Sequence, residues 1–104
     1  MLELILFNHT GSAFTVEMSL FRVDSDLSRS DARTYSRSID IDPQGETRRP
    51  DVGEIRQYLV QYDVYEDNSR RTDSDHVHYY PADDGEADGI AFDIRPPGVM
   101  TRRQ

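Results

Sequence analysis

The sequence predicts an all-β domain, a two-layer sandwich of seven short antiparallel strands. Apolar and polar residues alternate along several segments, which is typical of strands that are buried on one face. Turn-forming residues such as Gly11 and the triplet Pro43-Gln44-Gly45 separate these segments. No segment shows the period of about 3.6 residues that marks an amphipathic helix, so we expect strands to supply the core.

The first three predicted strands cover residues 2–7, 14–20 and 35–41. Apolar residues recur at every second position in the first two and at the end of the third. They form one candidate core face: Leu2, Leu4, Leu6, Phe14, Val16, Met18, Leu20, Ile39 and Ile41. Between the second and third strands, residues 24–31 are rich in Ser, Asp and Arg, with Leu27 as their only apolar residue. We expect these residues to form an exposed connection.

Four further strands are predicted in the second half of the chain. A weak one over residues 46–52 should lie at a sheet edge, because Pro50 cannot donate a hydrogen bond to a ladder. The strongest covers residues 57–65, where apolar and aromatic side chains share one face: Tyr58, Val60, Tyr62 and Val64. Shorter strands are expected at 76–80 and 90–94.

The C-terminus is expected to leave the domain. Pro96 and Pro97 fix their backbone and lack an N–H, so residues 96–104 are predicted to form an extended arm beyond a domain of residues 1–95. Val99 and Met100 are the apolar residues of this arm. Such an arm is suited to docking on a neighbouring molecule.

One motif carries a resemblance to a known family. Asp51-Val52-Gly53, followed by Tyr58-Leu59-Val60 at the start of the strongest strand, resembles the tyrosine corner of immunoglobulin-like domains. The resemblance implies an immunoglobulin-like sandwich in which the Tyr58 hydroxyl bonds to backbone a few residues upstream. It also implies binding through loops and strand edges, without implying a reaction. Because the chain has neither cysteine nor tryptophan, it is similar to the wider fibronectin-like class and not to antibody domains.

The charged residues indicate the solvent in which the protein works. The chain has no lysine, and its twelve arginines face twenty carboxylates, fourteen of them aspartate, for a net charge of -8. In molar salt the Debye length falls to about 3 Å, so this self-repulsion disappears while the hydration of the carboxylates remains. Arginine is weakly hydrated and binds carboxylates through two hydrogen bonds. The pattern resembles proteins of extremely halophilic archaea and their viruses.

No motif for catalysis or for a cofactor is present, and we expect neither enzymatic activity nor a cofactor. His76 and His78 are weak candidates for metal ligands, since residues two apart in a strand point the same way, although a solvated strand face is the favoured interpretation. The acidic run Asp83-Asp84-Gly85-Glu86 is a weak candidate for a single cation. No apolar run is long enough to span a membrane. The only clusters of basic residues are three arginine dipeptides in an acidic chain, so direct binding of nucleic acid is not expected.

These observations predict a non-enzymatic structural or interaction module. Within that class we expect a virion component of a halophilic archaeal virus, such as a capsid decoration, turret or tail-associated protein. It would join capsid or tail proteins in a homo- or hetero-oligomeric assembly through strand edges and the arm. The candidate partner-binding residues are Arg48, Arg49, Pro96, Pro97, Val99, Met100 and Arg102. The alternatives are a cell-surface or adhesion-type immunoglobulin-like domain and an acidic DNA-mimic inhibitor, which would place the chain at the surface or in the cytoplasm of a halophilic archaeon.

Overall fold

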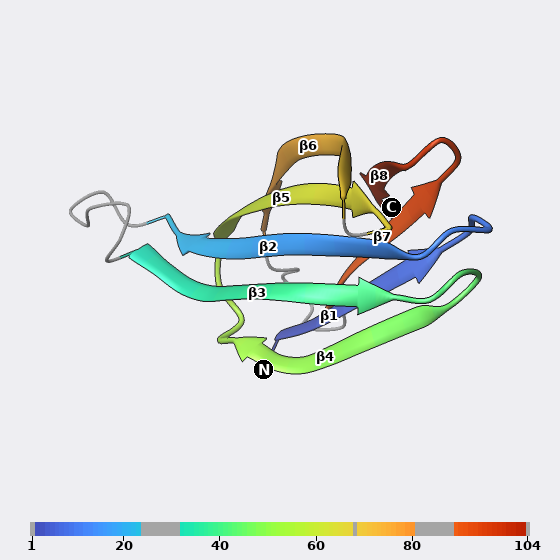
Figure 1. The fold of residues 1–104 in the computed structure, drawn as a ribbon. Helices are drawn as coiled ribbons and strands as arrows, with labels where there is room; N and C mark the ends of the chain where they lie inside the picture. The colour runs from blue at the N-terminus through green and yellow to red at the C-terminus, as the bar shows by residue number, and fades with distance from the viewer. Residues whose placement is uncertain (1, 24–31, 68, 81–88, 104) are drawn as a thin grey trace.

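The computed structural model describes residues 2–23, 32–67, 69–80 and 89–103, and these form a two-layer β structure (Figure 1). The expected connection at 24–31 and the acidic run at 83–86 lie outside the described residues. The described part contains eight strands and not the predicted seven: β1 (Leu2–Asn8), β2 (Phe14–Arg22), β3 (Arg33–Ile41), β4 (Glu46–Gly53), β5 (Tyr58–Glu66), β6 (Arg70–Tyr79), β7 (Gly89–Arg95) and β8 (Val99–Arg102). No helix in this part of the chain is long and apolar enough to cross a membrane.

The strands divide equally between two sheets. Sheet A has the order β4-β1-β7-β8 and sheet B the order β3-β2-β5-β6. Neighbouring strands run antiparallel except β1 and β7, which pair in parallel, so the prediction of a purely antiparallel sandwich is wrong at this pair. In constant-type immunoglobulin domains the first, second, fifth and fourth strands share a sheet. Here the first strand lies between the fourth and the seventh, so that strand order is absent.

The core lies between the two sheets and is made by the predicted alternating faces. The candidate core side chains of β1, β2, β3 and β5 are all buried. They are joined by Val52, Tyr79, Ile90, Phe92, Ile94 and Met100. Tyr62 of sheet B meets Phe92 of sheet A edge to face, with ring centroids 5.4 Å apart. Burial of a large apolar side chain contributes about 1.5 to 3 kcal/mol, so this layer holds the two sheets together.

Strand β6 begins at Arg70, well before the predicted start at residue 76. It is an edge strand of sheet B, and most of its side chains are exposed on both faces. The alternation that identifies a half-buried strand is therefore absent from its first half. Only Val77 and Tyr79 pack against the core, which is where the sequence showed the pattern.

The predicted C-terminal arm is the largest error in the sequence interpretation. Arg95 to Gly98 form a tight turn, closed by a 2.8 Å hydrogen bond from the Gly98 N–H to the Arg95 carbonyl, with the Pro96–Pro97 bond cis. Strand β8 then returns antiparallel to β7. This return buries Met100, which is only 2% exposed, in the core. Burial of this apolar side chain, together with the ladder to β7, favours the hairpin over an extended arm.

Candidate functional site

The predicted partner-binding residues lie at two opposite edges of sheet A and do not form one surface. Arg48 and Arg49 belong to edge strand β4, whereas Pro96, Pro97, Val99, Met100 and Arg102 belong to the hairpin of β7 and β8 at the other edge. The two prolines and Val99 are exposed. Met100 is a core residue and cannot contact a partner, so its assignment as a binding residue is wrong.

At the β4 edge, the arginine side chains are used within the molecule. Nε of Arg48 donates to Glu46 at 2.7 Å, and one of its terminal nitrogens lies 3.2 Å from Glu3. Arg49 donates to the carbonyl of Arg48 at 3.3 Å. Exposed pairs of this kind contribute at most about 1 kcal/mol, so both side chains can exchange these contacts for a partner.

At the opposite edge, side chains from sheet B occupy the outward backbone groups of β8. Asp73 accepts the N–H of Met100 at 2.9 Å, and the Tyr62 hydroxyl donates to the carbonyl of the same residue at 3.0 Å. Thr72 donates to the carbonyl of Gly98 at 2.7 Å. Burial, with Asp75 and Asp73 nearby, raises the pKa of Tyr62 to about 12, so the hydroxyl keeps its proton. A partner strand cannot pair at these positions, which removes the centre of β8 as an attachment edge.

The neighbouring edge of β6 is closed in the same way. Asp73 also accepts the N–H of Ser74 at 2.9 Å, and Asp75 accepts the N–H of His76 at 2.8 Å. Arg102 of β8 donates to the carbonyl of His78 at 3.3 Å, and its guanidinium lies 5.5 Å from the ring centroid of Tyr79. Arg102 is therefore a link between the two sheets.

The predicted metal ligands do lie side by side on the exposed side of β6. The rings of His76 and His78 are 5.8 Å apart, and Tyr80 stacks beside His78 at 6.5 Å. Within the described ranges, however, no group of three or more His, Asp or Glu side chains could hold a metal ion. The arrangement is a short aromatic row on a solvated strand.

Tyr58 makes the bond that defines a tyrosine corner. Its hydroxyl donates to the carbonyl of Glu54 at 2.8 Å, and burial raises its pKa. A Cβ at residue 53 would lie 2.6 Å from this hydroxyl, so the close approach requires Gly53. The motif fixes the connection from β4 to β5 and serves the fold.

A buried carboxylate that the sequence interpretation missed lies on the outer side of sheet A. Asp93 is 5% exposed, accepts two hydrogen bonds from Arg103 and lies 2.6 Å from Nε2 of His9. The Arg103 guanidinium covers the ring of Phe7 at 4.0 Å. The Arg103 bonds, and then the His9 contact, hold the pKa of Asp93 below its usual value, although burial acts in the opposite direction. The cluster fastens Arg103, which directly follows β8, to β1 and β7.

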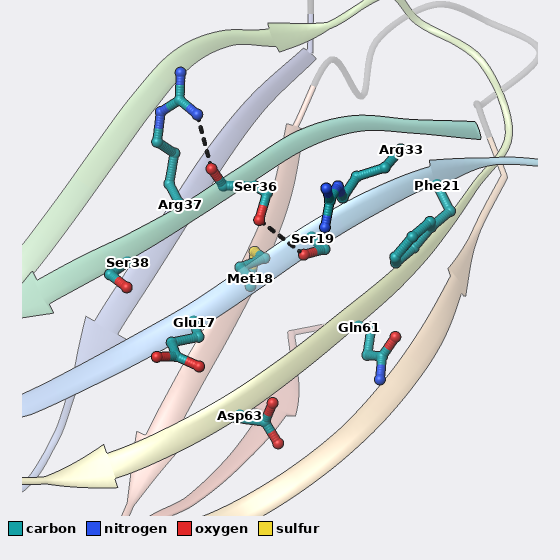
Figure 2. Close-up of a pocket in the computed structure, with 10 residues that line it drawn as sticks. All are labelled: Glu17, Met18, Ser19, Phe21, Arg33, Ser36, Arg37, Ser38, Gln61 and Asp63. Carbon is teal, nitrogen blue, oxygen red and sulfur yellow. Dashed lines mark hydrogen bonds between the residues drawn. The ribbon is translucent and has the colours of Figure 1, made fainter. Parts of the chain in front are cut away.

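The outer face of sheet B carries a shallow hollow of about 480 Å³, which the sequence interpretation also missed (Figure 2). Its middle is low because two short side chains, Ser19 of β2 and Ser36 of β3, lie there with their hydroxyls 3.2 Å apart, whereas Ser38 lies opposite Glu17 at one end. Ser19 lies directly opposite Ser36 on one side and Gln61 on the other. The lining is polar and open to solvent, unlike the enclosed apolar pocket that most small molecules occupy.

The two ends of this hollow carry opposite charges. Glu17 and Asp63 are directly opposed across β2 and β5 at one end, and Arg33 lies opposite Phe21 at the other. A register shift in the pairing of β2 and β3 leaves Thr34 as an extra residue and so places Arg33 on the same face as Phe21. Bulges of this kind often re-aim a side chain near a binding site.

Comparison with protein-family models, curated proteins and solved structures finds no match to this chain.

Proposed function

We propose that this chain is a non-enzymatic structural and interaction module, most directly a virion component of a halophilic archaeal virus. A capsid decoration, turret or tail-associated protein would meet this description. One observation carries the proposal: side chains occupy outward backbone groups along β6 and β8, while the outer face of sheet B is an open polar surface. A domain built in this way joins an assembly through a face of defined shape and resists open-ended strand pairing.

The charge composition supports a role in concentrated salt. A net charge of -8 without lysine is tolerated where the Debye length is short, and the arginines remain able to form forked bonds to carboxylates. In this proposal, partners are capsid or tail proteins and contact is made through arginine–carboxylate pairs at a dry interface. Such pairs are screened less than exposed ones.

The hollow supports binding better than catalysis. Acid–base catalysis needs a pocket in which two groups acquire separate pKa values. The hollow on sheet B is open along its length and is floored by serines. The proposal keeps two immunoglobulin-like features, the two-layer sandwich and the tyrosine corner at Tyr58. The strand order differs from that of constant-type immunoglobulin domains.

Quantitative mass spectrometry of purified particles from a halophilic culture that carries the gene tests the proposed function. The proposal expects the chain in the particles at a fixed ratio to the major capsid protein. Absence from the particles, with enrichment in the cell envelope, would contradict the virion role and support the cell-surface alternative.

A further inference from the structure

We propose that the outer face of sheet B binds the same face of a second copy of this chain, forming a two-fold symmetric dimer. The inference rests on the proposed role in an assembly and names the first partner in that assembly. It depends on the arrangement of charge along the hollow of Figure 2.

The face is divided into three rows that run across the strands. The acidic row contains Glu17 and Asp63, the middle row contains Ser19 with Ser36 and Gln61, and the third row contains Phe21 with Arg33. The acidic and third rows are four residues apart along β2, or about 13 Å, with the serine row midway. The face is thus negative at one end, neutral in the middle and positive at the other end.

This arrangement is complementary to itself. A two-fold axis that lies in the interface along the serine row reverses the strand direction of the second copy relative to the first. The acidic row of each copy then faces Phe21 and Arg33 of the other. In a two-fold interface each contact occurs twice, so both ends of the face are satisfied together. The short serines let the two faces approach at the axis, and two-fold dimers are the commonest symmetric oligomers.

Because the two carboxylates of the acidic row repel each other, a positively charged group from a second copy should bind between them. Directly opposed like charges on neighbouring strands destabilise a sheet. Asp63 has Arg71 at 3.7 Å, whereas no hydrogen bond or ion pair within the described ranges engages the carboxylate of Glu17 or the guanidinium of Arg33. Figure 2 shows Arg33 extending over the sheet toward Ser19, while Arg37 turns away and donates to the Ser36 carbonyl at 2.7 Å. In the dimer, Arg33 of each copy bridges the carboxylates of the other, and Phe21 shields the pair from the solvent.

The available area fits a modest dimer. Four strands of about nine residues present a face of about 19 by 30 Å, so two copies would bury about 1,100 Å² in total. Stable specific interfaces bury about 1,200 Å² or more, so this dimer should be a weak one that forms only at high protein concentration. Because each copy has a net charge of -8, screening of the overall repulsion should favour the dimer as salt is added.

Charge reversal tests the dimer by sedimentation equilibrium in molar KCl. Glu17→Arg places two arginines together at both ends of the interface, and Arg33→Glu places acidic residues together. Each variant alone should therefore raise the dimer dissociation constant about a hundredfold or more. Mixed in equal amounts, the two variants should form a heterodimer more readily than either variant dimerises alone, because residue 17 of each copy then faces a residue 33 of opposite sign. Glu54→Arg and Arg95→Glu make the same changes in net charge at exposed residues outside this face and should leave the dimer intact.

Far-UV circular dichroism of each variant shows whether it is still folded. Ser19→Trp tests the interface independently, because its large side chain would fill the hollow and keep the two faces apart. A folded Ser19→Trp variant should be monomeric. A wild-type chain that stays monomeric in molar KCl would overturn the dimer and leave the virion role untouched. A dimer that persists in both single charge variants would also overturn the proposal.

Discussion

The carboxylate of Asp73 in β6 accepts the backbone N–H of Met100 in β8 at 2.9 Å, across the gap between the two sheets. The same carboxylate accepts the N–H of Ser74 at 2.9 Å, so one side chain closes both edges on this side of the molecule. This contact adds to the burial of Met100 and the ladder to β7 in holding β8 against the domain.

Removal of this carboxylate should destabilise the fold. In Asp73→Ala, two backbone N–H groups lose their acceptor, and we expect the free energy of unfolding to fall by about 1 to 3 kcal/mol. Asp75→Ala is the matched control, because its carboxylate caps only the exposed His76 N–H, and it should cost less than about 1 kcal/mol. Urea unfolding in molar KCl measures both, and hydrogen exchange of the Met100 amide should accelerate only in Asp73→Ala. Equal losses in the two variants would contradict this role.

Asn8 should be among the most sensitive polar positions. It is 2% exposed, and its amide donates to the carbonyls of Ser12 and Asp42 at 2.7 and 3.1 Å, while its oxygen accepts from Thr10. Asn8→Ala should lower the free energy of unfolding by about 1 to 3 kcal/mol, because the buried Thr10 N–H and two partly buried carbonyls lose their partners. Asn8→Asp, which keeps the acceptor, should retain the Thr10 bonds and lose the two donated ones. A loss below about 1 kcal/mol for the alanine variant would show that water replaces the side chain.

The hydrogen bond of the tyrosine corner should make a measurable contribution to the free energy of unfolding. Tyr58→Phe removes the hydroxyl that donates to the Glu54 carbonyl and should lower the free energy of unfolding by about 0.5 to 1.5 kcal/mol. Tyr80→Phe is the control, since Tyr80 is 62% exposed, and it should change stability by less than about 0.5 kcal/mol. If the two variants melt at the same temperature, Tyr58 acts only through the packing of its ring.

Acid should weaken the cluster around Asp93. Its pKa is lowered in the folded protein, chiefly by the Arg103 hydrogen bonds, so the unfolded chain takes up a proton on this group at a higher pH. The stabilisation is complete above the unfolded pKa, near 3.8, and is lost as the pH falls through the folded pKa. Unfolding measured from pH 7 down through this window should show a smaller decline for Asp93→Asn than for the wild type. A decline of equal size in both would assign the acid sensitivity to other carboxylates.

The sequence predicted best those strands that have one buried and one exposed face. Segments 14–20 and 57–65 became β2 and β5, the two central strands of sheet B, where alternation is strong. The start of β6 lacked the signal because both of its faces are exposed, and β8 lacked it because a single buried residue, Met100, cannot define a period. The parallel pairing of β1 with β7 is set by packing between distant segments and leaves no local pattern.

The candidate sites differ in the same way: a local motif could be predicted from the sequence, whereas contacts between distant residues could not. Tyr58 could be identified because its motif is local, whereas the Asp93 cluster unites residues 9, 93 and 103. Its one local hint was a carboxylate set between Phe92 and Ile94. The hollow on sheet B depends on three strands in register, and the short serines that create it looked like ordinary solvated positions in the sequence. Arg33 reaches that face only because of the bulge at Thr34, and no local pattern in the sequence predicts this bulge.

We propose that this chain was selected to fold and assemble in concentrated salt. The most direct test is the free energy of unfolding as KCl rises from about 0.1 M to 1 M and beyond, over which the Debye length falls from about 10 Å to 3 Å. We expect a steady rise in stability, because the self-repulsion of a chain with net charge -8 is removed while its core is unchanged. A stability that stays constant or falls over this range would contradict it.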